Sequence, residues 1–393
     1  MTRIDDCILV MLQGVAFSGL MQRHQHLANE LSNYLPVIYI EETQSRLKFL
    51  FQGKVADPAI NGHKKGLQPV KDNLWLYKSP PESPRYYGYR KSSIATYTRI
   101  TKSIKPFLSK DKKVIIWLFS PHGIGAMGRF GEILTIFDCF DAFGEFPGEE
   151  RYKIEVKAAV REIAEKADIV FAASDELGEN LKIFNDHTYI LKNGCDAKHF
   201  LSGGTRPSAS DERVKLFDSI KHPIIGYMGD IAPWVNLELL KNCAERHPEW
   251  SIVLIGTWKR DKADLEKYPN VYSLGKIPYE ELPYYVGKFD IGTIPFELTN
   301  LTRVVNPLKL YEYFAFGLPV VSVPIPEVSI YEDLVYLAGS PDEFVALAEK
   351  GLKESPESEV KTKRVKIARE NSWHTRGETV RDLLEKCLRE ILP

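Results

Sequence analysis

The chain has 393 residues and a formal net charge of −1, and 44% of its residues are hydrophobic while 27% are charged. At roughly 100–200 residues per domain, this length predicts two domains, and the composition excludes disordered and fibrous proteins. The near-zero charge argues against general binding of nucleic acid.

Short apolar, β-branched runs alternate with helical patterns through the first half of the chain. The strands that we predict there are 7–12, 37–40, 114–119, 134–140, 169–173 and 189–191. Strands that are apolar on both faces belong to a parallel sheet covered by helices. Residues 1–200 therefore predict a Rossmann-like, doubly wound α/β domain.

The polar, Gly- and Pro-bearing stretch 201–211 interrupts the alternation and is typical of an interdomain linker. A second alternating series follows it. Its predicted strands are 224–228, 252–255, 271–274, 291–294, 320–323 and 335–338. Residues 212–374 thus predict a second Rossmann-like domain. Since ligands bind beyond the carboxyl ends of such strands, we expect an interdomain cleft.

The tail 375–393 carries apolar residues at helical spacing with charges between them, which predicts an amphipathic helix. This helix packs either on its own domain or back on the N-terminal domain. The sequence leaves both open.

The cysteines give no sign of a disulfide framework or a zinc site, because they are scattered and lack C-x-x-C spacing. They are Cys7, Cys139, Cys195, Cys243 and Cys387. The opening apolar run is too short for a secretory signal, and no stretch approaches the ~18 apolar residues of a membrane helix. We therefore expect a cytoplasmic protein.

One stretch, from Arg85 to Lys113, is strongly basic, with nine Lys and Arg residues against one acid and with aromatic residues between them. Anionic lipid headgroups attract such a stretch at roughly 1 kcal/mol per well-placed cation. A solvated helix face is the alternative. Our hypothesis is that 85–113 contacts an anionic membrane surface, which would associate the protein with the inner face of the plasma membrane.

A glycine-bearing segment, from Gly226 to Gly229 and Asp230, stands at the end of the first predicted strand of the second domain and just ahead of the following helix. Glycines there allow backbone N–H groups to approach a diphosphate, and a helix N-terminus favours negative charge. A tight strand-to-helix turn explains the same residues. Neither a dinucleotide fingerprint nor a P-loop occurs in the chain.

The segment 306–321 gives the strongest local signal. Asn306 and Pro307 are typical of a helix start, and Lys309 and Glu312 fall about one turn apart on one face. A cation and a carboxylate at a helix start can meet the phosphate and the ribose hydroxyls of a nucleotide-sugar. An ordinary i,i+3 ion pair is the alternative.

This segment resembles the nucleotide-sugar signature of GT-B glycosyltransferases, especially the bacterial family-4-like group that includes teichuronic-acid and capsular-polysaccharide transferases. Those proteins have a similar N-P-x-K-x-x-E-Y-x-A-x-G-x-P-V-V helix. Further similar segments are 22–28, 167–174, 192–196, 270–283 and 289–296. Nearly the whole chain is covered, so the resemblance implies a GT-B fold of two tandem Rossmann-like domains.

The resemblance also implies roles for single residues. Glu312 holds the donor ribose, Lys309 neutralises the diphosphate and assists its departure, the Gly226–Gly229 loop receives the phosphates, and the chain around Ile277 lies against the base. The donor-binding residues that we expect are Gly226, Gly229, Asp230, Ile277, Arg303, Asn306, Lys309 and Glu312.

Two departures from the family pattern concern catalysis. Many relatives carry a glutamate eight residues before the position of Glu312, where this chain has Val304, so a retaining mechanism is not implied. Relatives also commonly place an Arg and a Lys after the first strand of the second domain, whereas 230–236 has neither. Lys309, with Arg303, must then supply the positive charge.

Asp141 follows a predicted buried strand of the first domain, where its carboxylate can take a proton from an acceptor hydroxyl. A helix N-cap or a buried hydrogen-bond acceptor is the alternative. Asp138 is a weaker candidate for the same task. His122 is a competing catalytic candidate, and an ordinary loop histidine is the alternative. Arg23 is placed to touch an acceptor or donor phosphate, and a solvated helix-start side chain is the alternative.

The sequence therefore predicts a glycosyltransferase that moves a sugar from a nucleoside-diphosphate sugar, UDP- or GDP-linked, to a glycan or lipid-linked acceptor in surface polysaccharide synthesis. We expect no metal and no other cofactor, since no D-x-D triad occurs and GT-B enzymes use side chains and helix dipoles instead. The alternatives are a GT-B sugar-nucleotide epimerase and a catalytically silent GT-B protein that binds glycans or scaffolds an assembly.

Overall fold

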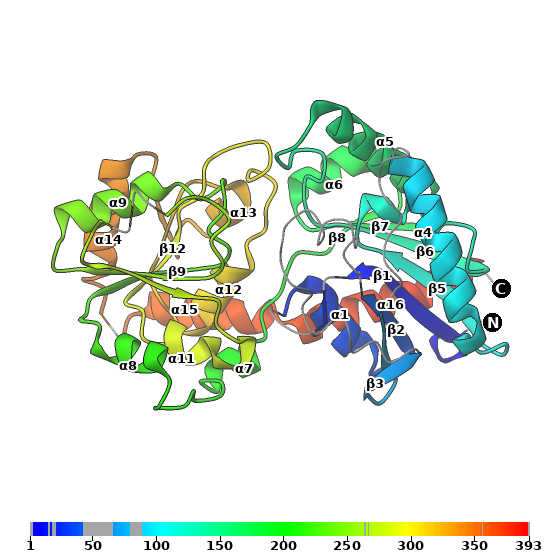
Figure 1. The fold of residues 1–393 in the computed structure, drawn as a ribbon, viewed down its shortest axis with the longest axis horizontal. Helices are drawn as coiled ribbons and strands as arrows, with labels where there is room; N and C mark the ends of the chain where they lie inside the picture. The colour runs from blue at the N-terminus through cyan, green and yellow to red at the C-terminus, as the bar shows by residue number, and fades with distance from the viewer. Residues whose placement is uncertain are drawn as a thin grey trace, which may run out of the picture. The chain divides into compact units, whose positions relative to one another are not determined.

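The structure is a computed structural model that describes residues 3–14, 16–17, 21–41, 66–78, 89–262, 265, 267–355 and 357–391. The chain divides into two compact α/β units (Figure 1). Unit 1 comprises Met1–Lys192 and His374–Pro393, and unit 2 comprises Asn193–Trp373.

Unit 1 is built on an eight-stranded sheet of order β3-β4-β2-β1-β5-β6-β7-β8. Its strands are β1 (Cys7–Gly14), β2 (Val37–Glu41), β3 (Leu67–Lys71), β4 (Leu74–Lys78), β5 (Lys113–Leu118), β6 (Glu132–Cys139), β7 (Ile169–Ala172) and β8 (Thr188–Ile190). All pairs are parallel except β3 with β4. The six predicted strands are confirmed. The β3–β4 hairpin, which turns at Asn73 with φ 59°, was not predicted.

Helices cover both faces of this sheet (Figure 1). They are α1 (Arg23–Leu31), α4 (Tyr89–Ile104), α5 (Glu150–Lys166), α6 (Asp175–Lys182) and most of α16 (Trp373–Ile391). Helix α4 packs beside α5. On α16, the His374 imidazole lies 3.1 Å from the Glu30 carboxylate of α1, and Arg381 lies over the ring of Tyr34.

Unit 2 has a wholly parallel six-stranded sheet of order β11-β10-β9-β12-β13-β14. The strands are β9 (Ile224–Met228), β10 (Ser251–Ile255), β11 (Val271–Gly275), β12 (Ile291–Ile294), β13 (Val320–Ser322) and β14 (Tyr336–Leu337). All six were predicted, and the doubly wound α/β prediction is confirmed. The strand order reverses between β9 and β12, which is the switch point where open α/β sheets bind ligands.

The helices of unit 2 lie on both faces of its sheet, with α9 and α14 packed together on one of them (Figure 1). The helices are α7 (Ala197–Leu201), α8 (Glu212–Ser219), α9 (Leu237–Arg246), α11 (Leu282–Val286), α12 (Leu308–Ala315), α13 (Pro326–Ser329), α14 (Pro341–Gly351) and α15 (Glu359–Glu370). Helix α12 packs on α15 and α7.

The chain passes from unit 1 to unit 2 between Lys192 and Asn193. The stretch 201–211, which we predicted as the linker, lies within unit 2, where the Thr205 N–H donates to the Glu280 carbonyl at 2.7 Å. In the described part of the chain, no helix combines the length and apolarity needed to cross a membrane.

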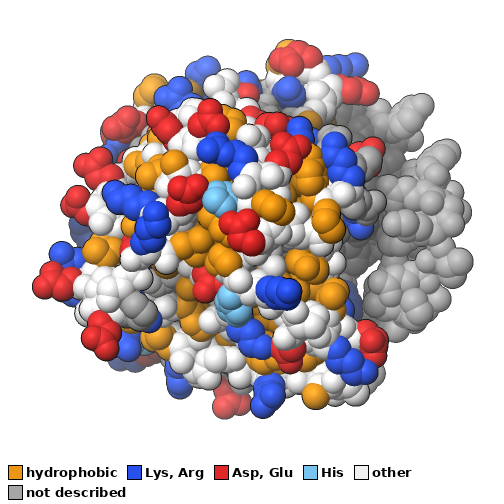
Figure 2. All heavy atoms as spheres, turned by 90° about the vertical axis from the view of Figure 1, so that its left-hand side faces the viewer, with side chains coloured by type: hydrophobic (Ala, Val, Ile, Leu, Met, Phe, Trp, Pro, Cys, Tyr) orange, Lys and Arg blue, Asp and Glu red, His pale blue; other side chains and the backbone are white. Residues whose placement is uncertain are grey.

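Figure 2 faces unit 2 and shows Lys and Arg side chains interspersed with Asp and Glu, with hydrophobic side chains between them. Ion pairs within unit 2 join side chains of opposite sign. The Arg246 guanidinium lies 2.7 Å from the Asp342 carboxylate, and the Lys241 ammonium lies 3.2 Å from Glu238. The alternation of signs agrees with the near-zero net charge of the chain.

Candidate functional site

Lys309 lies at the switch point of unit 2, held by aromatic groups from two neighbouring strands. Its Nζ is 3.3 Å from the hydroxyl of Tyr227 in β9. The same ammonium lies 4.5 Å from the centroids of the Tyr227 ring and of the Phe296 ring, which follows β12. Electron-rich ring faces attract a cation, so the start of α12 presents one positive charge beyond the carboxyl ends of β9 and β12.

Burial shifts the protonation of both charged residues on this face of α12. It lowers the pKa of Lys309 to about 7, against the attraction of Glu312 and Asp230. It raises the pKa of Glu312 to about 7, against the attraction of Lys309. Such a pair is poised to change its protonation when an anionic ligand arrives, which is typical of functional sites.

The loop after β9 passes directly beside Lys309. Gly229 has φ 138°, and a side chain there would stand 3.0 Å from the Lys309 Nζ. The Gly229 N–H donates to the Ile255 carbonyl at 2.8 Å. The Tyr227 hydroxyl donates to the Asp230 carbonyl at 2.9 Å. The structure therefore brings the predicted residues Gly229, Asp230 and Lys309 together.

Gly226 lies inside the strand that we predicted at 224–228, whereas the resemblance implies a place in the phosphate-binding loop. It lies in the middle of β9, paired with Val253 of β10 and Gly292 of β12, rather than in the loop. A Cβ on Gly226 would meet the Phe289 ring at 2.0 Å. The glycine is therefore needed for core packing.

Asn306 is also engaged by the protein itself, with 1% of its surface exposed. Its amide nitrogen donates to Glu327 at 2.8 Å and to the Tyr311 hydroxyl at 3.1 Å, and its Oδ1 accepts from the Asn193 N–H at 3.1 Å. Since these groups occupy the side chain, Asn306 acts on the structure of the site. It fixes the segment that leads to Asp196, whose charge raises the pKa of Glu312 further after burial.

Three other positions near the predicted donor site differ in exposure. Ile277 is buried, so its side chain packs in the core of unit 2. Arg303 is exposed. Val304 is buried at 5% exposure, which makes the position where relatives carry a glutamate part of the apolar core.

The structure adds a lysine that the sequence did not indicate. The Lys259 Nζ lies 2.5 Å from the Asp230 carboxylate. Lys259 follows β10 and lies 29 positions after Asp230 in the sequence. No local motif marks such a pair, because it depends on β9 and β10 being neighbours in the sheet.

In unit 1, the Arg23 guanidinium and the Asp138 carboxylate form a buried ion pair, with Nε–Oδ distances of 3.1 and 3.0 Å. The two side chains are 3% and 0% exposed. Arg23 thus holds Asp138 and is not a solvated helix-start residue. Burial lowers the pKa of the neighbouring His24 to about 3, and the His24 ring meets the Phe119 and Phe140 rings edge to face.

Asp141 lines a pocket of ≈ 500 Å³ between the loop after β6, helix α5 and helix α6. Burial raises the pKa of Asp141 to about 7, and the attraction of Arg23 opposes the rise. Phe143 and Phe184 contribute apolar surface, and Lys157 and Arg161 contribute charge. A carboxylate with a raised pKa is a stronger base, as proton abstraction requires.

His122 lies elsewhere than predicted, because it is packed inside unit 1 with 2% exposure. It belongs to the short 3₁₀ helix η4 (Pro121–Gly125), and its carbonyl accepts a hydrogen bond from the Ser93 hydroxyl. Its ring contacts those of Tyr89 and Tyr97 at 5.5 and 6.0 Å. This environment favours a structural role over a catalytic one.

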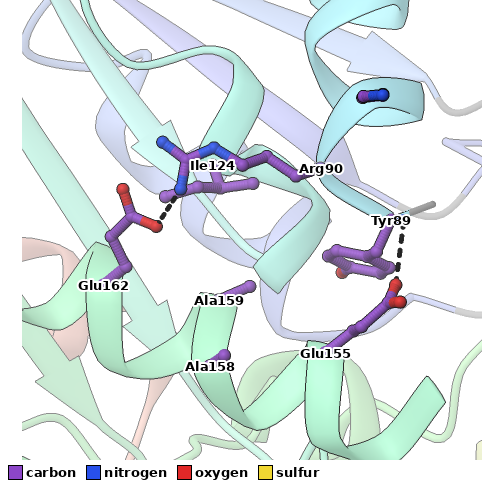
Figure 3. Close-up of a pocket in the computed structure, with 8 residues that line it drawn as sticks. Tyr89, Arg90, Ile124, Glu155, Ala158, Ala159 and Glu162 are labelled. Atoms are coloured by element: carbon purple, nitrogen blue, oxygen red, sulfur yellow. Dashed lines mark hydrogen bonds and ion pairs between the residues drawn. The ribbon is translucent and has the colours of Figure 1, made fainter. Parts of the chain in front are cut away.

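A second pocket, of ≈ 370 Å³, lies between α4, η4 and α5. Figure 3 shows two contacts at this pocket: the Arg90 side chain reaches the Glu162 carboxylate, and the Tyr89 N–H donates to the Glu155 carboxylate at 2.9 Å. Ala158 and Ala159 line the pocket on α5. These pairs join the two helices, so the pocket is explained by helix packing.

In the basic stretch 85–113, helix α4 turns one face to the core and the opposite face to solvent. Tyr89 and Tyr97 point into the core, whereas Arg90, Lys91 and Lys102 are exposed. Phe107, after the helix, is 42% exposed. Arg85, Tyr86 and Tyr87 lie outside the described residues.

Among the residues that the structure describes, no three His, Cys, Asp or Glu side chains are grouped to hold a metal ion. Independence from metal stays a prediction.

Residues 222–353 match the family model described as glycosyl transferases group 1. A Bacillus subtilis protein named as a teichuronic acid biosynthesis glycosyltransferase, TuaH, is 27% identical over 293 residues, which cover 69% of this chain and 72% of that protein. These matches concern sequence, and the family match lies within unit 2.

Solved structures share the fold at low identity. Sucrose-phosphate synthase from Thermosynechococcus elongatus superposes with a TM-score of 0.71 at 14% identity, covering 98% of this chain and 100% of that one. Anabaena HepE in complex with UDP and glucose gives 0.64 at 13%, covering 96% and 98%. The chain is therefore a glycosyltransferase with the GT-B fold that carries a domain of the glycosyl transferases group 1 family.

Proposed function

We propose that the chain transfers a sugar from a nucleoside-diphosphate sugar, bound by unit 2, to a hydroxyl of a glycan or lipid-linked acceptor in surface polysaccharide synthesis. The proposal rests on one observation: the Lys309 ammonium lies against the rings of Tyr227 and Phe296, and Glu312 follows one turn further along α12. An ammonium there meets a diphosphate, and a carboxylate meets the vicinal hydroxyls of a ribose.

Two relatives support this substrate class. HepE was solved with UDP and glucose, so a protein of the same fold binds a uridine nucleotide. TuaH is named for teichuronic acid biosynthesis, and this name supports a surface glycan as the class of acceptor. We accordingly propose UDP- or GDP-linked sugars as donors.

On the acceptor side, we propose Asp141 as the group that accepts the proton of the attacking hydroxyl. The pocket that it lines combines aromatic surface with charged and polar groups, including Lys157 and Asn180. Aromatic faces and polar edges are what an amphiphilic glycan acceptor needs.

The decisive experiment is isothermal titration of the purified chain with UDP, GDP, ADP, CMP and dTDP in the presence of EDTA, with Lys309→Ala beside the wild type. We expect one nucleotide to bind selectively and the variant to lose it. Lys267→Ala is the control, because Lys267 is exposed over the Tyr268 ring. Absence of binding to any nucleotide would favour the silent scaffold, and donor turnover without acceptor would favour the epimerase.

The exposed cations of α4 support a further proposal, that the chain binds anionic membranes. Replacing Lys91 and Lys102 by Glu should abolish co-sedimentation with phosphatidylserine vesicles at low salt, since each well-placed cation contributes about 1 kcal/mol. Wild-type protein that ignores such vesicles would remove the proposal.

A further inference from the structure

We propose that Lys259 is a second donor-binding cation, so that Lys309 and Lys259, which both lie beside the Gly229–Asp230 loop, bind the diphosphate together. The inference rests on the proposed function and assigns a residue to the same site. The segment 230–236 contains no Arg or Lys. Lys259 can supply the missing positive charge, because it follows β10, the strand next to β9 in the sheet.

Backbone hydrogen bonds fix Lys259 beside the loop. The Ile231 N–H donates to the Thr257 carbonyl, and the Lys259 N–H donates back to the Ile231 carbonyl, both at 2.9 Å. The loop after β9 thus continues the pairing of β9 with β10 beyond the ends of the two strands. The fold therefore sets the backbone position of Lys259, from which its side chain reaches the Asp230 carboxylate.

Close approach of the two loops depends on Gly256. Its φ is 145°, and a Cβ there would stand 1.9 Å from the Gly229 carbonyl oxygen. Gly256 and Gly229 are therefore in direct backbone contact, which leaves no room for a side chain between Lys259's segment and the loop that borders Lys309.

The charge of Lys259 is accessible to a ligand. Its side chain is 52% exposed and that of Asp230 is 30% exposed, so the pair is solvated and its dissociation costs little. Lys309 is half-buried, and its attraction to Asp230 supports its charge. A diphosphate bound at the Gly229–Asp230 loop would be attracted by both lysines, which gives two positive charges where a single lysine provides one.

The neighbouring cations have other contacts. Arg260 donates to the Val235 carbonyl at 2.9 Å, and Lys262 lies over the Trp258 ring. In the described segment 257–262, Lys259 is thus the cation paired with Asp230.

The test compares Lys259→Ala, Lys259→Arg and the control Lys267→Ala by titration with UDP, UMP and uridine, or with the same series of whichever nucleoside the wild type selects. We expect Lys259→Ala to weaken the diphosphate about tenfold or more, as loss of one charge-assisted contact implies, to leave uridine unchanged, and to lessen the salt dependence of binding. Lys259→Arg should restore most of the affinity.

A Lys259→Ala variant with wild-type affinity for the diphosphate, while Lys309→Ala loses it, would overturn the role of Lys259 and leave the proposed function standing. Equal weakening of all three ligands would also overturn it, because a structural change has no preference for phosphate. A wild-type chain that binds no nucleotide would overturn the function and this inference together.

Discussion

The Lys309 ammonium lies 3.3 Å from the hydroxyl of Tyr227, 82 residues earlier in the chain. This contact joins the start of α12 to the central strand β9, at the point where the strand order reverses. Burial lowers the pKa of this ammonium to about 7, against the attraction of Glu312 and Asp230, so the charge at the site responds to pH in the neutral range.

Lys309→Arg should remove this pH dependence. A lysine with a lowered pKa loses its proton as the pH rises through about 7, so wild-type affinity for a nucleoside diphosphate should fall between about pH 7 and pH 9, by at most tenfold per pH unit. Arginine stays protonated there, and its affinity should be nearly flat. Titration of both proteins with the nucleoside diphosphate between about pH 7 and pH 9 measures the difference. A wild-type affinity that does not change with pH would contradict the role of Lys309 as the diphosphate-binding cation.

Glu312→Ala should weaken binding of the selected nucleoside diphosphate by about 1–3 kcal/mol, because a carboxylate that accepts from ribose hydroxyls is lost. Repeating the titration with the 2′-deoxy nucleotide isolates the contact: the variant should lose much less against it than against the ribonucleotide. An equal loss for both sugars would mean that Glu312 does not meet the 2′-hydroxyl.

Asp141→Asn should lower turnover by about 10²–10⁴-fold while sparing donor affinity, as expected when a general base is removed. In the wild type, the raised pKa of Asp141 keeps the carboxyl protonated below about pH 7, so turnover should rise with pH through that value. Glu145→Gln is the control, since Glu145 lines the same pocket but pairs with Lys157 at 2.6 Å. A fully active Asp141→Asn enzyme would dispose of the assignment.

Arg23→Ala should lower the free energy of unfolding by about 3–5 kcal/mol, because it leaves the Asp138 carboxylate buried without its cation. Replacing both residues together, Arg23→Met with Asp138→Leu, should cost less than the single change. Urea denaturation of the two variants measures the difference. If the double variant proved the less stable, the enclosure of the pair would be refuted.

Gly256→Ala should disturb the donor loop, since a Cβ at that position collides with the Gly229 carbonyl at 1.9 Å on a backbone with positive φ. We expect the free energy of unfolding to fall by about 1–3 kcal/mol and nucleotide binding to weaken. Gly148→Ala is the matched control, with its nearest neighbour 4.0 Å away. Unchanged thermal unfolding and unchanged affinity in Gly256→Ala would contradict the contact.

The strands and the α12 region could be predicted because their signals are local. A buried strand such as 224–228 is apolar along its length, and the helix after Pro307 begins and ends at residues with definite backbone preferences. The spacing of Lys309 and Glu312 likewise follows from helical geometry. The short hairpin β3–β4, half exposed and without a clean alternation, had no such signal.

The sequence by itself determined two α/β units, their strands, the resemblance to GT-B glycosyltransferases and the pair Lys309 and Glu312. Tertiary structure alone decided that His122 is packed, that Arg23 binds Asp138 across 115 residues and that Lys259 reaches Asp230. The reason is physical: periodicity and capping act within one element, whereas these contacts depend on which strands become neighbours in the sheet.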